Sequence, residues 1–152
     1  MRCSCGYPSK EECSGIFETL LGEVYTDFRY GKTHRLMVDA YAMQHTERYM
    51  ISAKSYAAHL TGMCIHMEYA DDPELFRLTQ QWLNGENQLE KPALPKDFGD
   101  ITIGYVWEAK DGAEHNRLVE KWAFDVWEAY SSYHQLAREW IATAKTDRAE
   151  PR

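Results

Sequence analysis

The fold is decided by a stretch in the second half of the chain, LVEKWAFDVWEAYSSYHQLAREWI at residues 118–141. Apolar or half-apolar side chains recur along it at about the period of an amphipathic helix. These positions are Leu118, Trp122, Val126, Trp127, Tyr130, His134, Leu136, Ala137, Trp140 and Ile141. The pattern predicts one long helix over residues 112–144 at the centre of a helical bundle.

The same period occurs at four earlier places in the chain. It predicts helices over about residues 12–29, 33–45, 52–69 and 74–83. Gly31 ends the first of them, and the short link that follows makes the first two helices antiparallel.

Two other stretches do not fit a helix. Residues 84–100 hold two prolines and two glycines and predict a long irregular connection. Residues 101–107 alternate like a strand, but without a partner strand we expect an extended loop there. The prediction is therefore a single all-α, four-helix-bundle-like domain over residues 1–152, with a cysteine knuckle at 1–13 and a flexible tail at 145–152.

Composition narrows the class of protein. The 152 residues carry a formal net charge of -7, which disfavours the basic surface that nucleic-acid binding needs. The first residues lack the apolar core of a signal peptide, and no later stretch is long and apolar enough for a membrane span. We therefore expect a cytoplasmic protein that binds neither nucleic acid nor membrane.

Three cysteines crowd the start of the chain as Cys3-x-Cys5-x7-Cys13. In a reducing compartment such spacing is more often metal-binding or catalytic than disulfide-forming, although unliganded thiols in a frayed segment are the simpler alternative. If the first two helices are antiparallel, Cys13 lies level with His45, which we predict as the fourth ligand. Three thiolates and an imidazole favour a structural zinc site. Cys64 has apolar neighbours at helical spacing and is expected in the core.

A second, open metal site is a separate possibility. His59 and His134 lie on different predicted helices, and they could meet in the bundle interior beside Asp39 or His34. Two or three such ligands around a divalent metal with a vacant position would activate water or a thiol. Each histidine could equally be an ordinary interfacial side chain with its ring hydrogen-bonded.

This second site would make the chain a metal-dependent enzyme, either a hydrolase or a thiol transferase. Tyr41 or Gln44 would then address a small-molecule substrate. A third hypothesis is a metal-free interaction module, which could form a homo-oligomer. His115, beside Glu114 at the start of the last predicted helix, is expected to act as a cap or to lie at the surface.

Several motifs also suggest a family. They are Cys3-x-Cys5-Gly6 with Cys13, the run His34-Arg-Leu-x-Val-Asp-Ala-Tyr-Ala-x-Gln-His45, Ala58-His59-Leu60, and Trp122-Ala-x-x-Val-Trp-Glu-Ala-Tyr-x-x-Tyr-His134. With them, nearly the whole chain resembles a family of small uncharacterised bacterial helical proteins, a domain of unknown function.

That resemblance implies no activity. It marks as family-motif positions Cys5, Cys13, His34, Asp39, Gln44, His45, His59 and His134. Members look to have Cys-x-x-Cys-Gly at the start, so the spacing of Cys3 and Cys5 departs from the pattern. A weaker similarity, of architecture only, is to the DinB-like metal-binding bundles, whose thiol transferases use three histidines on a divalent metal.

Overall fold

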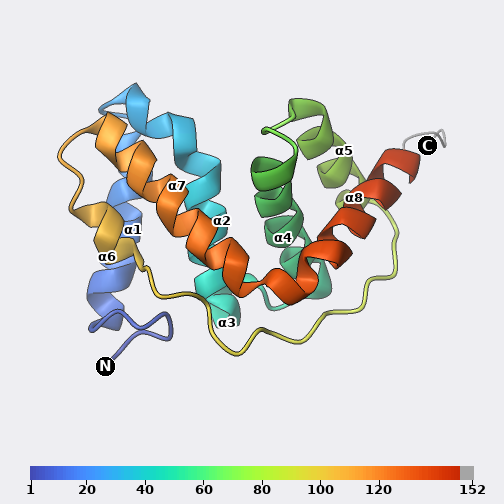
Figure 1. Cartoon of the computed structure of the whole chain (residues 1–152), viewed down its shortest axis with the longest axis horizontal. Helices are drawn as coiled ribbons and strands as arrows, with labels where there is room; N and C mark the ends of the chain where they lie inside the picture. Colours follow the sequence, from blue (N-terminus) through green and yellow to red (C-terminus); the bar gives the residue numbers. More distant parts are fainter. Residues whose placement is uncertain (148–152) are drawn as a thin grey trace.

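The computed structural model describes residues 1–147, and the regular secondary structure of these residues is all helical, without a strand (Figure 1). The helices are α1 (Lys10–Glu23), η1 (Phe28–Thr33), α2 (His34–Gln44), α3 (Thr46–Tyr49), α4 (Ala53–Glu68), α5 (Pro73–Asn84), α6 (Ile103–Trp107), α7 (Gly112–Ala129), η2 (Ser131–Tyr133) and α8 (His134–Asp147), where η denotes a 3₁₀ helix. The predicted all-α class is confirmed. The detail of a four-helix bundle is not confirmed.

Helix α2 lies at the centre of the molecule. It packs against α7 on one side and against α4 on the other, while α4, α5 and α8 pack on one another. Figure 1 accordingly shows two groups of helices, α1, α2, α6 and α7 on the left and α4, α5 and α8 on the right. Because α2 is covered from both sides, Met37, Ala40 and Met43 are almost completely buried.

Side-chain caps fix where three of the helices begin. Ser9 accepts a hydrogen bond from the backbone of Glu12 at the start of α1, and Asp111 accepts one at the start of α7. Ser52 and Ser55 form a reciprocal capping box at the start of α4. Each cap satisfies backbone N–H groups that have no partner inside the helix and stabilises it by about 1 kcal/mol.

Residues 85–102 form the predicted irregular connection, which runs along the bottom of Figure 1 from α5 to α6 and is called the strap below. Side chains from the helices hold its backbone. The Gln44 amide donates to the carbonyls of Phe98 and Ile101 at 2.9 and 2.7 Å, and its oxygen accepts from the Trp122 indole at 3.0 Å. One carboxylate oxygen of Asp125 accepts from the backbone N–H groups of residues 100 and 101.

The single helix predicted over residues 112–144 is wrong, because the chain turns between α7 and α8. The Tyr130 hydroxyl at this turn donates to the carbonyl of Met43 at 2.6 Å, which anchors the turn to α2. His134 stacks on Trp127 and hydrogen-bonds its carbonyl at 2.7 Å. Both α7 and α8 have an apolar face, so the helical periodicity of the sequence continues through the turn between them and does not reveal it.

The first helix also differs from the prediction, since α1 ends at Glu23. Asp27 accepts a hydrogen bond from the backbone of Arg29 and starts η1 instead. As a consequence Tyr25 and Phe28, which fit the apolar period, are 89% and 85% exposed. Local side-chain capping has replaced the last turns of the expected helix.

Four smaller predictions concern single segments or residues. Residues 103–107 are helical, as α6, because they pack between α1 and α7 rather than running as an extended loop. His115 is only 1% exposed, packed 4.4 Å from the Tyr30 ring, so its expected place at the surface is wrong. Cys64 is fully buried, as predicted. Of the predicted tail, residues 145–147 belong to α8, and residues 148–152 lie outside the described part.

Nowhere in residues 1–147 does a helix combine the length and the apolar character that crossing a bilayer requires.

Candidate metal centre

The four predicted zinc ligands come from three segments. Cys3 and Cys5 lie in the loop before α1, Cys13 lies in the first turns of α1, and His45 directly follows α2. The loop is tightly turned, because Cys3 donates its N–H to Tyr7 and accepts from Gly6. Gly6 has a φ of 101°, a left-handed value that favours glycine. This turn places the two cysteines side by side.

The donor atoms converge to the dimensions of a single-ion site. The three Sγ atoms and one ring nitrogen of His45 all lie within 4.8 Å of one another, and all four residues are buried. His45 Nε2 is 3.2 Å from the Cys3 sulfur and 3.4 Å from the Cys13 sulfur, and the Cys5 and Cys13 sulfurs are 3.8 Å apart. A tetrahedral Zn²⁺ with ordinary bond lengths needs separations of about 3.8 Å between sulfurs and about 3.5 Å from sulfur to nitrogen.

The imidazole of His45 is oriented by its second nitrogen. Nδ1 lies 2.7 Å from the carbonyl of Tyr41, one turn earlier in α2. A carbonyl only accepts, so Nδ1 carries the hydrogen and Nε2 presents its lone pair to the sulfurs. The Tyr41 ring also stacks on the imidazole at 3.8 Å and on Phe17 at 3.8 Å. This packing fixes the plane of the ligand ring.

The thiols of the cluster differ in acidity. The hydrogen bond from Cys5 contributes most to lowering the pKa of Cys13 far below its usual range, helped by His45 and Tyr41 and opposed by burial. The same Cys5–Cys13 hydrogen bond, together with burial, raises the pKa of Cys5. Without a metal, the hydrogen-bonded Cys5–Cys13 pair therefore holds a proton between its two sulfurs. A metal ion would displace that proton.

The surroundings close the cluster on the outside. Ser4 hydrogen-bonds Glu47 of α3 at 3.0 Å, and the N–H of Lys10 reaches the carbonyl of Met1 at 2.9 Å. The adjoining cavity, lined in part by Cys3, Tyr41 and His45, measures only about 60 Å³. Pockets that hold drug-sized ligands are roughly 300–1,000 Å³. The cavity beside the cluster is therefore too small for a ligand of that size.

Comparison with known protein families assigns the chain to one of them. The profile of a family of unknown function (DUF5946) matches residues 1–131, a span that includes all four candidate ligands. The chain belongs to this family. No curated protein and no solved structure matches this DUF5946 member, so the architectural similarity to DinB-like bundles stays a prediction.

Of the predicted second metal site, only Asp39 and His59 are joined by a hydrogen bond in this DUF5946 member. Asp39 and His59 are hydrogen-bonded at 2.9 Å, but the ring of His134 is held by the Trp127 carbonyl at 2.7 Å. His34, half-buried, begins α2. Within residues 1–147, the only group of three or more potential ligands with suitable spacing is the cysteine–histidine cluster.

Two residues expected to address a substrate have other roles. Gln44 is fully buried and uses its amide to hold the strap and Trp122. Tyr41 supports the metal centre through its carbonyl and ring, a function that sequence reasoning missed. The sequence could have shown this role of Tyr41, because a residue four positions before a ligand on a helix lies one turn away on the same face.

Proposed function

We propose that this DUF5946 member is a helical zinc-binding protein in which Cys3, Cys5, Cys13 and His45 hold one Zn²⁺. The observation that carries the proposal is the convergence of three sulfurs and one imidazole nitrogen within 4.8 Å of one another. Thiolate and imidazole donors suit Zn²⁺, and a tetrahedral arrangement is its usual geometry in such sites. Hard cations such as Mg²⁺ and Ca²⁺ prefer oxygen ligands.

The role we propose for the ion is structural. Four protein ligands complete a tetrahedral shell and leave no position for a water or substrate, as a catalytic zinc requires. The four ligands are between 0% and 8% exposed, which keeps solvent from the ion. The ion would tie the loop before α1 to the end of α2, two segments more than thirty residues apart.

The test is the metal content of the chain purified without a histidine tag from zinc-supplied cells. We expect about one zinc per chain, three thiols protected from a thiol reagent, and loss of the metal in Cys13→Ser and His45→Ala. His34→Ala is a matched control that removes a histidine from the other end of α2 and should retain the zinc. Metal-free protein with reactive thiols would contradict the proposal, and iron in place of zinc would contradict the identity of the ion.

A further inference from the structure

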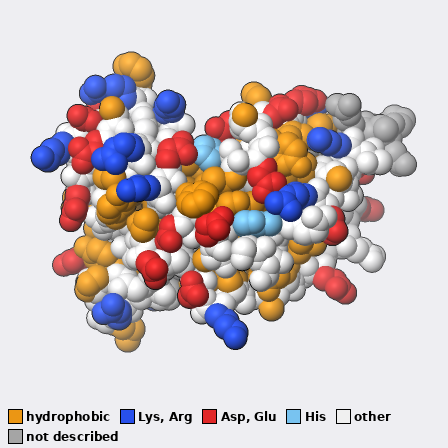
Figure 2. Space-filling model, viewed as in Figure 1, with side chains coloured by type: hydrophobic (Ala, Val, Ile, Leu, Met, Phe, Trp, Pro, Cys, Tyr) orange, Lys and Arg blue, Asp and Glu red, His pale blue; other side chains and the backbone are white. Residues whose placement is uncertain are grey.

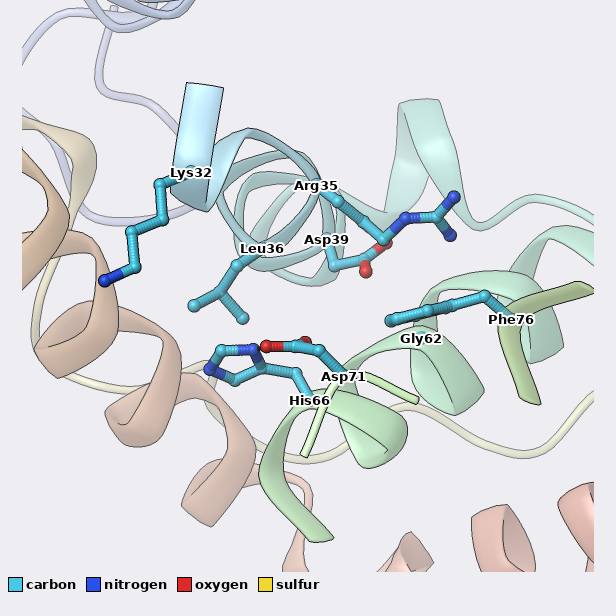
Figure 3. Close-up of a pocket in the computed structure, with 8 residues that line it drawn as sticks. All are labelled: Lys32, Arg35, Leu36, Asp39, Gly62, His66, Asp71 and Phe76. Carbon is cyan, nitrogen blue, oxygen red and sulfur yellow. Dashed lines mark hydrogen bonds and ion pairs between the residues drawn. The ribbon is translucent and has the colours of Figure 1, made fainter. Parts of the chain in front are cut away.

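A second feature with binding character lies between α2 on one side and α4 and α5 on the other. It is a cavity of about 220 Å³ lined by Lys32, Arg35, Asp39, Gly62, His66 and Phe76, among others (Figure 3). The space-filling view shows the molecular surface hollowed between the two helical groups (Figure 2). None of these residues belongs to the metal centre, so the cavity is independent of the proposed zinc site.

Asp39 places a buried carboxyl group in the cavity wall. The residue is 7% exposed, and burial raises the pKa of its carboxyl group, opposed by the hydrogen bond from His59. Only one of its oxygens, Oδ1, is used by His59; Oδ2 has no hydrogen-bond partner within residues 1–147. A Cβ at Gly62 would lie 2.6 Å from Oδ2, so glycine is what leaves space for this oxygen. Oδ2 is open to the cavity rather than enclosed by protein atoms, so a cationic group in the cavity can pair with it.

Arg35 brings a positive charge next to that carboxylate. It precedes Asp39 by one turn of α2, and Figure 3 shows the two side chains leaving the helix close together. Such a pair commonly forms an ion pair on a helix, yet none forms between these two residues. The guanidinium instead lies over the Phe76 ring, 4.3 Å from its centroid. Arg35 and Asp39 are therefore a basic and an acidic side chain that lie close together in the cavity wall without forming an ion pair.

At the other end of the cavity, an imidazole and two carboxylates already bind one another. His66 lies between Asp71, at 2.7 Å, and Glu120, at 2.8 Å. Asp71 and Ala70 both adopt left-handed backbone, at φ 57° and 52°, which holds the Asp71 carboxylate against the imidazole. Asp39 and Asp71 each use one oxygen for a histidine, but Asp71 is exposed, so Asp39 is the buried carboxyl group that the cavity offers to a ligand. Exposed Lys32 adds a positive charge at the rim.

We propose that this cavity binds a small zwitterion of the α-amino-acid class. The ammonium group of the ligand pairs with Asp39 Oδ2, its carboxylate pairs with the Arg35 guanidinium, and its side chain extends along Leu36 towards Lys32. An α-amino acid carries its two charges on adjacent carbons, which matches a cation and an anion one helical turn apart. The cavity is smaller than the roughly 300–1,000 Å³ of drug-sized sites, so it accommodates only a compact molecule.

The experiment uses the full chain as purified, with its metal. A thermal-shift survey of the proteinogenic amino acids at millimolar concentration selects the best binder, and titration calorimetry compares it with the corresponding amine and the corresponding deaminated acid. We expect the amino acid to bind at least about tenfold more tightly than either analogue, because each analogue leaves one charged group of the cavity unpaired.

Variants then connect binding to the residues. Arg35→Gln alters an exposed side chain, should fold normally, and should weaken binding by about tenfold to a hundredfold. Arg77→Gln on the exposed face of α5 is the matched control and should leave affinity unchanged. Asp39→Asn should abolish binding, with its fold checked by circular dichroism. The proposal is overturned if no amino acid binds, if the amine binds as tightly as the amino acid, or if Arg35→Gln and Arg77→Gln behave alike.

Discussion

Replacing Cys13 with serine should make the thermal stability of the chain independent of zinc. The ligands come from residues 3–5, 13 and 45, which only the folded chain brings together, so the ion binds the native state far better than the unfolded state. At free zinc a thousandfold above the dissociation constant, this difference stabilises the fold by about 4 kcal/mol. In a chain of 152 residues each kcal/mol changes Tm by about 2–4 °C, so stripping the metal should lower Tm by about 8–16 °C.

The assay is a pair of melts for each protein, with zinc and with a strong chelator, followed by circular dichroism. Cys64→Ser is the matched control, because it changes a fully buried cysteine on α4 that lies outside the cluster. Placing a hydroxyl in that apolar position costs about 1–3 kcal/mol, whatever the metal content. Cys64→Ser should therefore melt lower than the native chain and still respond to the chelator, whereas Cys13→Ser should not respond.

Two results would refute this reasoning. The first is a native chain that loses its zinc to the chelator, verified by metal analysis, with Tm unchanged. The second is a Cys13→Ser protein that keeps the full difference between the two melts. Either would mean that the ion does not tie the loop to the helices.

Three further predictions follow from particular contacts. Apparent zinc affinity should rise by about tenfold per pH unit for each proton released, since the hydrogen-bonded Cys5–Cys13 pair holds a proton without metal; competition with a zinc chelator at several pH values measures this. Gly62→Ala should destabilise the fold by about 1–3 kcal/mol, because its Cβ would collide with a buried carboxylate. Gly15→Ala, whose Cβ meets nothing within 4 Å, should instead stabilise α1 by about 0.5–1 kcal/mol. Urea unfolding of both variants measures these two changes. Gln44→Leu should cost about 1–3 kcal/mol or more in the same assay, since the indole N–H of Trp122 loses its acceptor, and an unchanged midpoint would contradict the role given to the amide.

The proximity of the candidate ligands could be predicted from the sequence, although the path between them was only partly foreseen. Cys13 and His45 were expected at the same level because two helices reverse about Gly31. In the structure α1 is shorter and η1 occupies part of the reversal, yet α1 and α2 still run in opposite directions (Figure 1). The reversal alone determines which ends meet, so the prediction was insensitive to where the first helix stops.

Of the predicted second metal site, only Asp39 and His59 are in contact, because helical periodicity gives the direction of a side chain only within its own helix. His59 and Asp39 do face each other across α4 and α2, as expected of interior positions. His134 depended on a continuous last helix, and the turn at Tyr130 gave its ring a backbone carbonyl instead. That turn is held by a contact with Met43, and no pattern within the last segment could have revealed it.

The hydrogen bonds that hold the backbone of the strap determine which of its residues can be substituted. Gln44 and Asp125 hold the backbone of residues 98–101, and the side chains of Leu89, Phe98 and Ile101 pack against the core. Substitutions at its exposed positions should therefore leave its course unchanged, because Gln44 and Asp125 bind the backbone whatever the neighbouring side chains are. Gly99 is the exception, because its φ of 95° and its contact with Asp125 leave no space for a Cβ. Variation in this segment should thus be concentrated at the exposed positions, away from Gly99 and from the three apolar side chains that pack against the core.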